Sequence, residues 1–329
     1  MALCGCNLDR DANATFFIDG VQKESGSIST RTGTLANADG FEIGRSRDQV
    51  SYANGLIDEV KIYNYLRTPA QIAWEYNQGG PIAWWKLDEC SGTVANDSSG
   101  NLYKGFIYPG DTAGGGLNNY VGSCDSGNTE DMWYNGRNGK YNASLDFDGN
   151  NDYVCTDTNS DTTCDDVDAL DMRTNDWTVA AWVKTTSTGQ VVSKDNNGTT
   201  YMWYLNINSS GQCSVRIIGT GSDSRIATST STTFFDGNWH HCAATITRSG
   251  SMQTYVDGRV DGTPVSISDI STQDFNDSVA VYLGRRVAGG YFNGQIDDAR
   301  IYNYALTAQQ MKSVFNEGAV RFGPNEGSP

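Results

Sequence analysis

Short apolar runs separated by polar, glycine-containing stretches recur along this 329-residue chain, a pattern typical of β-strands joined by turns. Residues 177–183 (WTVAAWV) carry bulky side chains at odd and even positions alike, as does a strand covered on both faces. Residues 255–260 (YVDGRV) place an Asp-Gly pair between two apolar runs, and glycine readily adopts the positive φ of a tight turn. Residues 17–21 (FIDGV) repeat that pattern. Both segments are therefore predicted hairpins.

Two distant parts of the chain are similar in sequence. Residues 55–65 read GLIDEVKIYNY and residues 294–304 read GQIDDARIYNY, and the similarity extends outward at a nearly constant spacing. The second copy continues upstream to about residue 80, whereas the first copy begins part-way through. We therefore predict the C-terminal part of a truncated domain at residues 1–79, a complete domain at residues 80–320, and a linker or tail at residues 321–329.

A short helix is predicted at the end of each copy. Thr68 and Thr307 are each followed three residues later by glutamine, which is the spacing of a capping box. Pro69 would take the first helical position, where its missing N–H is not needed. Because the rest of the chain predicts strands and turns, we expect an all-β antiparallel β-sandwich with one short C-terminal helix per repeat.

The composition excludes several functions. With 39 acidic and 23 basic residues the net charge is −16, which repels phosphate backbones and anionic membranes, so we expect no nucleic-acid partner. No apolar run approaches the roughly 18 residues of a transmembrane helix, so no membrane insertion is expected. Residues 1–6 do not resemble a secretion signal, and any such signal is expected upstream of this sequence.

The eight cysteines favour an extracellular or cell-surface location. None forms a C-x-x-C pair and only two histidines are present, so disulfides explain the cysteines better than zinc does. Three groupings are evident from position: Cys155 with Cys164 in an acidic loop, Cys90 with Cys124 around a glycine-rich loop, and Cys213 with Cys242 in strand-like segments. Because eight cysteines allow about 105 pairings, the connectivity stays open.

A set of motifs occurs in a recognisable order. These are AWWKLDE at 83–89, DSSGN at 97–101, LDFDG at 145–149, DYV at 152–154, the run at 177–183, and GQIDDARIYN at 294–303. This succession resembles the laminin-G-like jelly-roll domains of the concanavalin-A-like lectin/glucanase superfamily, as in modular bacterial cell-surface proteins. The resemblance implies two antiparallel sheets packed face to face, recognition of carbohydrate or protein, and often a structural calcium ion.

The same resemblance implies a set of calcium ligands, because calcium prefers oxygen donors from Asp, Asn and backbone carbonyls. Asp97 and Asn101 in the early loop would meet Asp297 or Asp298 near the last strand, and Asp58 is the first-copy equivalent of Asp297. The loop departs from the family pattern at residue 104, which is lysine. The alternative is that Asp97 closes an Asx-turn and Asp297 accepts a hydrogen bond from a loop backbone.

A second acidic group has the composition of a cation loop but not its spacing. Its members are Asp157, Asp161, Asp165, Asp166 and Asp168. The glycine and terminal glutamate of an EF-hand loop are absent, so we expect a solvated loop tied by a disulfide.

Sugar recognition would use an exposed aromatic platform with polar neighbours. Tyr201 and Trp203, and Tyr291 in a loop before Gly294, are the candidates. Alternatively, the rings of Tyr201 and Trp203 fill the sandwich core, because alternate residues of a strand share one face.

Catalysis is not expected. Retaining glycoside hydrolases of this fold need two carboxylates about 5 Å apart, and residues 80–320 contain only three glutamates, none in a Glu-x-Asp-x-Glu motif. We therefore predict a non-enzymatic extracellular recognition or adhesion module with a glycan or protein partner. A structural spacer is the alternative, and a glycoside hydrolase is the least favoured one. The truncated N-terminal half-domain would expose unpaired strand edges, which allows self-association.

Overall fold

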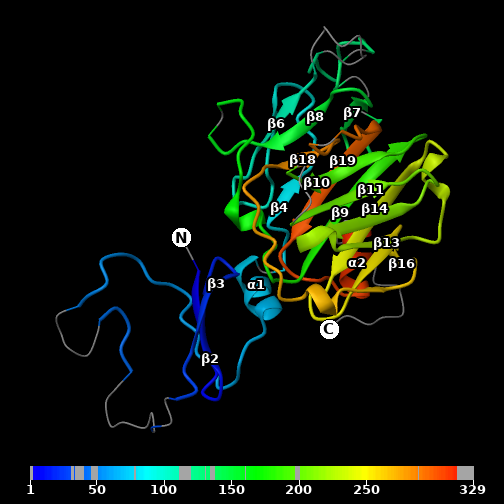
Figure 1. Ribbon diagram of the computed structural model, residues 1–329. Helices are drawn as coiled ribbons and strands as arrows, with labels where there is room; N and C mark the ends of the chain where they lie inside the picture. The colour runs from blue at the N-terminus through cyan, green and yellow to red at the C-terminus, as the bar shows by residue number, and fades with distance from the viewer. Residues whose placement is uncertain are drawn as a thin grey trace, which may run out of the picture.

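The computed structural model shows a β-sandwich with a smaller lobe beside it, built from the N-terminal residues (Figure 1). It describes residues 3–30, 33, 41–45, 51–77, 79–110, 120–129, 131–133, 138–159, 161–196, 201–287 and 289–316. The expected tail at residues 321–329 lies outside the described residues. The expected all-β antiparallel sandwich of the jelly-roll class is confirmed.

The described part of the N-terminal lobe contains a three-stranded antiparallel sheet and one helix. The sheet has the order β1-β2-β3, with β1 at Cys4–Leu8, β2 at Asn13–Ile18 and β3 at Val21–Ser27. Helix α1 spans Pro69–Asn77. The strands β2 and β3 form the hairpin expected from the FIDGV pattern, with Asp19 at φ 53° and Gly20 at φ 77°.

One layer of the sandwich, here called the β10 sheet, has the order β13-β12-β11-β10-β18-β8-β6-β5. Its strands are β13 (Ser224–Thr228), β12 (Cys213–Ile218), β11 (Met202–Ile207), β10 (Gly189–Lys194), β18 (Val281–Leu283), β8 (Tyr153–Thr156), β6 (Gly105–Tyr108) and β5 (Val94–Ala95). All neighbouring strands in it are antiparallel.

The other layer, here called the β9 sheet, has the order β16-β15-β14-β9-β19-β4, with β17 paired to β15 and β7 to β19. Its strands are β16 (Arg259–Val260), β15 (Ser251–Val256), β14 (Trp239–Ile246), β9 (Trp177–Thr185), β19 (Asn293–Tyr302), β4 (Ala83–Trp85), β17 (Val265–Ser266) and β7 (Leu145–Asp148). Short 3₁₀ turns lie at Asp168–Leu170, Thr220–Ser222, Thr233–Phe235 and Ser268–Ile270. Helix α2 spans Ala308–Phe315 and begins at the expected capping box on Thr307.

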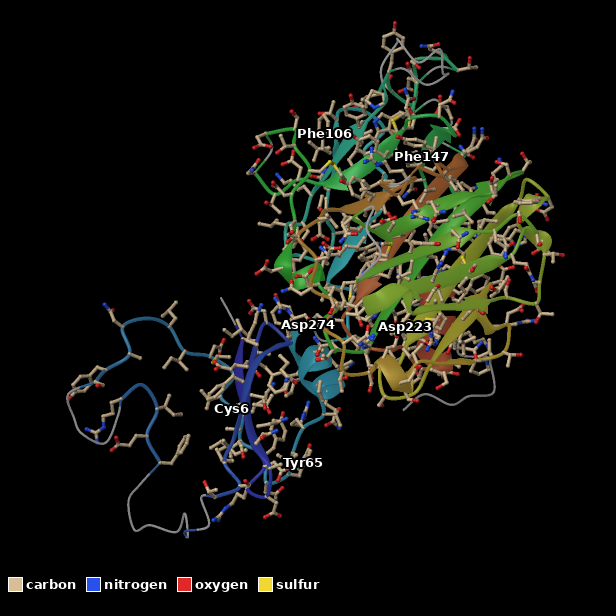
Figure 2. All side chains as sticks on the ribbon, viewed as in Figure 1. Cys6, Tyr65, Phe106, Phe147, Asp223 and Asp274 are labelled. Carbon is tan, nitrogen blue, oxygen red and sulfur yellow. A yellow bond between two sulfur atoms is a disulfide. The ribbon has the colours of Figure 1, made fainter. Side chains whose placement is uncertain are left out.

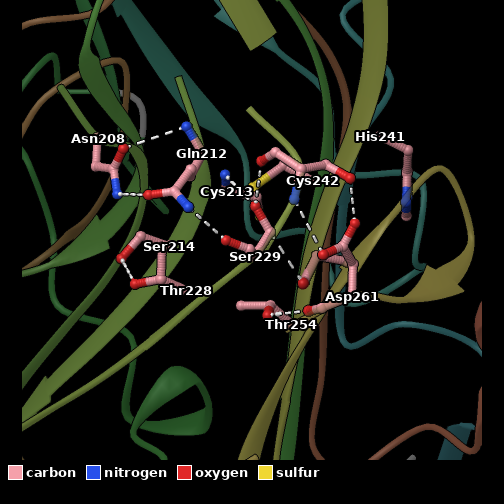
Figure 3. The surroundings of a disulfide bond; sticks show 12 residues. Asn208, Gln212, Cys213, Ser214, Thr228, Ser229, His241, Cys242, Thr254 and Asp261 are labelled. Atoms are coloured by element: carbon pink, nitrogen blue, oxygen red, sulfur yellow. Dashed lines mark hydrogen bonds between the residues drawn. A yellow bond between two sulfur atoms is a disulfide. The ribbon is translucent and has the colours of Figure 1, made fainter. Parts of the chain in front are cut away.

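The core lies between the two sheets. Trp177 of β9 and Trp203 of β11 meet there with ring centroids 4.7 Å apart, and both side chains are buried. The disulfide Cys213–Cys242 joins β12 to β14, so it links the two layers covalently (Figure 3). The disulfides Cys90–Cys124 and Cys155–Cys164 are also present, so all three groupings made from the sequence are bonded pairs.

The N-terminal lobe rests on the sandwich through α1. Ala73 packs into an apolar cluster that includes Tyr302 and Met311 of the sandwich. The hydroxyl of Tyr76 donates a hydrogen bond to Asn101 Oδ1 at 2.9 Å, and the hydroxyl of Tyr304 donates one to the carbonyl of Gly79 at 2.7 Å. These contacts bury one face of α1 and tie the lobe to the sandwich.

Candidate functional site

Three tyrosines and one arginine gather on the outer face of the β10 sheet. Tyr108, Tyr153 and Tyr282 come from β6, β8 and β18, which are adjacent strands. The rings of Tyr108 and Tyr153 stack with centroids 4.7 Å apart, and Tyr282 meets Tyr153 edge-on at 5.9 Å. The Arg285 guanidinium lies 4.1 Å from the Tyr153 ring centroid and 4.6 Å from that of Tyr282. We call these four residues the tyrosine–arginine surface.

Strand alternation places these rings outside the sandwich. Ile107, Val154 and Leu283 are the neighbouring residues on the same three strands, and they belong to the core. Since successive side chains on a strand point to opposite faces, the tyrosines point outward. The register pairs Tyr108 with Tyr153 directly, which brings their rings together.

The surface is partly open to solvent. Tyr108 is 37% exposed and Tyr153 is half-buried, whereas Tyr282 is 8% exposed. Burial raises the pKa of the Tyr153 phenol, Arg285 lowers it, and the neighbouring phenols, including that of Tyr291, raise it further. Tyr291, a sequence candidate, therefore lies beside this surface rather than on a platform of its own.

The other two aromatic candidates lie elsewhere. Trp203 is 1% exposed and packs on Trp177, so it belongs to the core and offers no face to a ligand. Tyr201 is half-buried and meets Phe275 edge-on at 5.9 Å. The alternative in which Trp203 fills the core is the one that the structure shows.

A polar cavity of about 450 Å³ lies where β4 and β19 meet the loop at Tyr141. Asp88, Asp297 and Asp298 line it, together with Lys86 and Arg300. Asp298 is salt-bridged to Arg300 at 2.7 Å and also accepts a hydrogen bond from the Trp84 indole. Asp88 accepts one from the backbone of Ala143 at 3.1 Å.

Asp297 is the unusual member of this cavity. Its side chain is fully buried; Oδ2 accepts a hydrogen bond from the Tyr141 backbone at 2.8 Å, while the buried Oδ1 has no hydrogen-bond partner in the structure. Burial raises the pKa of this carboxyl to about 8, and the nearby Asp298 and Asp88 add to the shift. A buried carboxylate oxygen without a partner is costly, and a cation would offset that cost.

Asp97 and Asn101 form hydrogen bonds within and beside their own loop rather than meeting Asp297 and Asp298. The Asp97 carboxylate accepts hydrogen bonds from the backbones of Trp84, Ser99 and Tyr103 and from the Ser99 hydroxyl. Asn101 donates from its amide to the carbonyl of Ile82 and accepts from Tyr76. Neither residue lines the cavity that holds Asp297 and Asp298. Asp58, the first-copy equivalent of Asp297, is exposed in the N-terminal lobe.

Asp166 and Asp168 of the second acidic group lie beside Asp171, which the sequence analysis did not include, and an ammonium partly neutralises this cluster. One carboxylate oxygen each from Asp166, Asp168 and Asp171 lies within 4.8 Å of the others, which would suit a metal ion. However, the buried Lys194 ammonium is 2.7 Å from Asp166 and 3.1 Å from Asp171, and it also donates to the carbonyl of Val279. Lys194 therefore supplies the positive charge that a cation would bring, and the sequence did not indicate this residue.

Two segments of the chain match the model of a known protein family. A family model described as the concanavalin A-like lectin/glucanases superfamily matches residues 6–73 and 148–312. The chain belongs to this superfamily. A comparison with curated proteins finds no significant match. Neither helix in the described part of this superfamily member is long and apolar enough to cross a bilayer.

Solved structures of similar fold include two binding domains from bacterial toxins. The binding domain of Paraclostridial Mosquitocidal Protein 1 has a TM-score of 0.51 and 12% sequence identity, covering 73% of this chain and 52% of that one. The binding domain of Botulinum neurotoxin DC in complex with rat synaptotagmin II has a TM-score of 0.50, 12% identity and the same coverages. This superfamily member spans about half the length of those chains, and at such identity the likeness shows the fold alone.

Proposed function

We propose that this chain is a non-catalytic extracellular recognition module that binds a glycan or a protein through the tyrosine–arginine surface. The observation that carries the proposal is the stacked pair Tyr108 and Tyr153 with Arg285 above it, on the outer face of the β10 sheet. A solvent-facing sheet surface is normally polar, so a cluster of rings there needs a reason.

The chemistry of this surface suits binding. Tyrosine and arginine are enriched where protein interfaces hold their binding energy, because they offer large rigid area together with a polar end. Sugar C–H faces pack on such rings, and the Arg285 guanidinium can donate to carboxylates. One binding domain of similar fold, that of Botulinum neurotoxin DC, was solved in complex with rat synaptotagmin II, and this supports a protein partner.

The residues described favour binding over catalysis. Of the three glutamates in residues 80–320, the structure describes Glu89, and its Oε1 accepts hydrogen bonds from the backbone and amide of Asn96. Glu130 and Glu317 lie outside the described residues. A glycosidase would need two carboxylates facing each other across a substrate cleft, and Glu89 does not line the cavity that holds Asp88, Asp297 and Asp298.

A structural calcium ion belongs to the same proposal. Asp297, with its unpartnered buried oxygen, would be the central ligand, and Asp298 and Asp88 line the same cavity. Calcium takes six to eight oxygens, so carbonyls and water would complete the set. The ion would fix the last strand of the sandwich; it has no role in chemistry.

The proposal also divides the chain and places it outside the cell. We propose that residues 1–79 are the C-terminal part of a truncated laminin-G-like domain, residues 80–320 a complete one, and residues 321–329 a linker or tail. Three disulfides support an oxidising compartment. Self-association through residues 1–79 stays a prediction from the sequence.

A screen of glycan and extracellular-protein arrays tests the binding function, with calcium and with a chelator. The informative variant is Tyr153→Ala, and its matched control is Tyr120→Ala, a tyrosine that is 51% exposed in a loop elsewhere. We expect Tyr153→Ala to weaken the strongest hit at least tenfold while the protein remains folded, and Tyr120→Ala to bind like the wild type. No specific ligand under any condition would favour the spacer alternative and contradict the proposal.

A further inference from the structure

The guanidinium of Arg285 makes no hydrogen bond or ion pair with the described residues. It lies 4.1 Å from the Tyr153 ring centroid and 4.6 Å from that of Tyr282. An aromatic ring attracts the positive charge but supplies no oxygen acceptor. The Nε atom is buried without a hydrogen-bond partner, and an unpaired buried donor is costly. Arg285 therefore favours a ligand that brings an anionic acceptor.

Two other arginines of the same sheet region differ from Arg285. Arg286, the next residue along the chain, donates from Nε to Asp195. Arg216 of β12 donates from Nε to the hydroxyl of Ser224 at 2.7 Å and from Nη1 to that of Tyr204 at 3.1 Å. Both guanidinium groups are used within the protein, so the unpaired state of Arg285 is a local feature of the tyrosine–arginine surface.

The phenol hydroxyls of this surface are also without partners in the described part of the chain. Those of Tyr108, Tyr153 and Tyr282 make no hydrogen bond to another described residue. By contrast, the hydroxyls of Tyr76 and Tyr304 both donate hydrogen bonds within the protein. A phenol can donate one hydrogen bond and accept others. The surface thus presents three groups of this kind beside one guanidinium.

The surface is fixed from beneath. The Ser193 hydroxyl donates to the backbone carbonyl of Arg285 at 2.6 Å, which ties that residue to β10. Phe106 of β6, labelled in Figure 2, packs against an apolar cluster that contains Tyr282 and the disulfide-bonded Cys155. Binding groups that are already held in place lose little conformational freedom when a ligand arrives.

We propose that the tyrosine–arginine surface binds a glycan through a sugar residue that carries a carboxylate, that is, a hexuronic or a nonulosonic acid. This inference rests on the recognition function proposed above and names its ligand class. The carboxylate would accept hydrogen bonds from the Arg285 guanidinium, and the sugar hydroxyls would pair with the phenols. An acidic peptide offers carboxylates without neighbouring hydroxyls on one rigid ring, so the sugar suits these side chains better.

The recognition has to be local. The net charge of −16 repels anions at long range, so a general basic surface does not hold the ligand. Arg285 is half-buried, and solvent and salt screen a half-buried ion pair less than an exposed one. Binding should therefore depend on Arg285 itself, and an arginine elsewhere on the molecule serves as a control.

Pairs of oligosaccharides test this inference by calorimetric titration into the full chain. Each pair ends in glucuronic acid, galacturonic acid or N-acetylneuraminic acid, and the second member is the methyl ester of the same sugar. Esterification keeps the ring and its hydroxyls but removes the negative charge. The three acids are separate arms, so they distinguish a hexuronic from a nonulosonic ligand.

Three protein variants assign any preference for the acid to a residue. Arg285→Gln removes the charge, and Arg285→Lys keeps the charge but loses the planar arrangement of donors. Arg259→Gln is the matched control, because Arg259 is exposed on β16 of the other sheet and its loss changes the net charge equally. Thermal unfolding confirms that each variant is folded.

We expect the wild type to bind at least one acid tenfold or more tightly than its ester. Arg285→Gln should abolish this preference and Arg285→Lys should reduce it, whereas Arg259→Gln should keep it within twofold. Equal binding of acid and ester, a preference that survives in Arg285→Gln, or no binding of any of the acids would overturn the inference.

Tyr153→Ala separates this inference from the recognition function on which it rests. If a neutral glycan or a protein binds and is lost in Tyr153→Ala, without any preference for acids, the inference fails and the recognition function stands. If no ligand is weakened by Tyr153→Ala, both fail. An Asp- and Glu-rich peptide that binds more tightly than the sugars, and is lost in Arg285→Gln, would assign the surface to a protein partner and overturn the inference too.

Discussion

The buried ammonium of Lys194 is matched by nearby carboxylates. Lys194, 1% exposed, lies between Asp166 and the fully buried side chain of Asp171. Burial raises the pKa of the Asp171 carboxyl and the Lys194 ammonium lowers it. This arrangement makes the pair structural, because removing one partner leaves an uncompensated charge in a low-dielectric site.

Lys194→Met should therefore lower the free energy of unfolding by about 3–5 kcal/mol. Urea unfolding at neutral pH measures the loss. The double variant Lys194→Met with Asp171→Asn removes the ammonium and the fully buried carboxylate but keeps the partly exposed Asp166, and it should recover part of the loss. A double variant less stable than Lys194→Met alone would contradict this account.

The calcium proposal can be tested by comparing a variant at Asp297 with a variant at Asp58, the equivalent residue in the first copy. Calcium should raise the midpoint of thermal unfolding of the wild type, since a ligand at a hundredfold excess over its Kd stabilises by about 2.7 kcal/mol. Asp297→Asn should lose that response, whereas Asp58→Asn, an exposed control, should keep it. A calcium response that survives in Asp297→Asn would place the ion elsewhere.

His240 predicts a pH dependence of stability. Its ring nitrogens lie 3.0 Å from Asp257 and 3.3 Å from Asp236, and these hydrogen bonds raise the pKa of the imidazole above 6.5, although burial lowers it. A raised folded-state pKa gives stabilisation that is complete below the unfolded pKa and lost as pH rises through the folded one. His241 is fully buried, and burial lowers its pKa to about 3, so it acts in the opposite direction.

The comparison of wild type with His240→Gln isolates this effect, because His241 is common to both proteins. The difference in free energy of unfolding should be largest near pH 5.5 and shrink towards pH 9, as urea titrations at several pH values would show. A difference that stays constant across this range would show that the imidazolium does not contribute.

At the scale of elements, local signals in the sequence were sufficient to predict individual turns and the starts of helices. The Asp-Gly hairpin at Asp257–Gly258 and the capping box at Thr307 both form, because each depends on residues within a few positions. The tyrosine–arginine surface could not be found in this way. Its rings come from β6, β8 and β18, and their neighbourhood depends on strand order and register, which are properties of the whole sheet.

The disulfides differ in what they join. Cys213–Cys242 links the two sheets across a separation of 29 residues, within a hydrogen-bonded setting in which Cys213 donates to Ser229 (Figure 3). Cys155–Cys164 closes only nine residues at one end of β8.

Replacing both cysteines of each pair with alanine should show which of the two disulfides contributes more to the free energy of unfolding. From loop closure we expect a loss of about 3–4 kcal/mol for Cys213–Cys242 and about 2–3 kcal/mol for Cys155–Cys164. Guanidinium unfolding under non-reducing conditions gives both values. The reverse order would mean that native-state packing, rather than chain entropy, sets their contribution.

At the scale of the whole molecule, the sequence indicated the fold class more firmly than the site. Trp203 was a candidate platform because its segment is aromatic. Its position along β11, however, places its side chain on the face of the strand that is buried in the core. Asp297 and Asp298 do meet in one cavity, but Asp97 and Asn101 organise a neighbouring loop. Such outcomes depend on which face each strand buries, and a single sequence does not reveal this when both faces are apolar.

The central claim is that the tyrosine–arginine surface is the binding site. The most direct measurement is calorimetric titration of the strongest ligand from the arrays into the wild type, Tyr153→Ala and Tyr120→Ala. We predict one site per chain, with affinity reduced at least tenfold in Tyr153→Ala and changed less than twofold in Tyr120→Ala. Equal affinities in all three proteins would contradict the account.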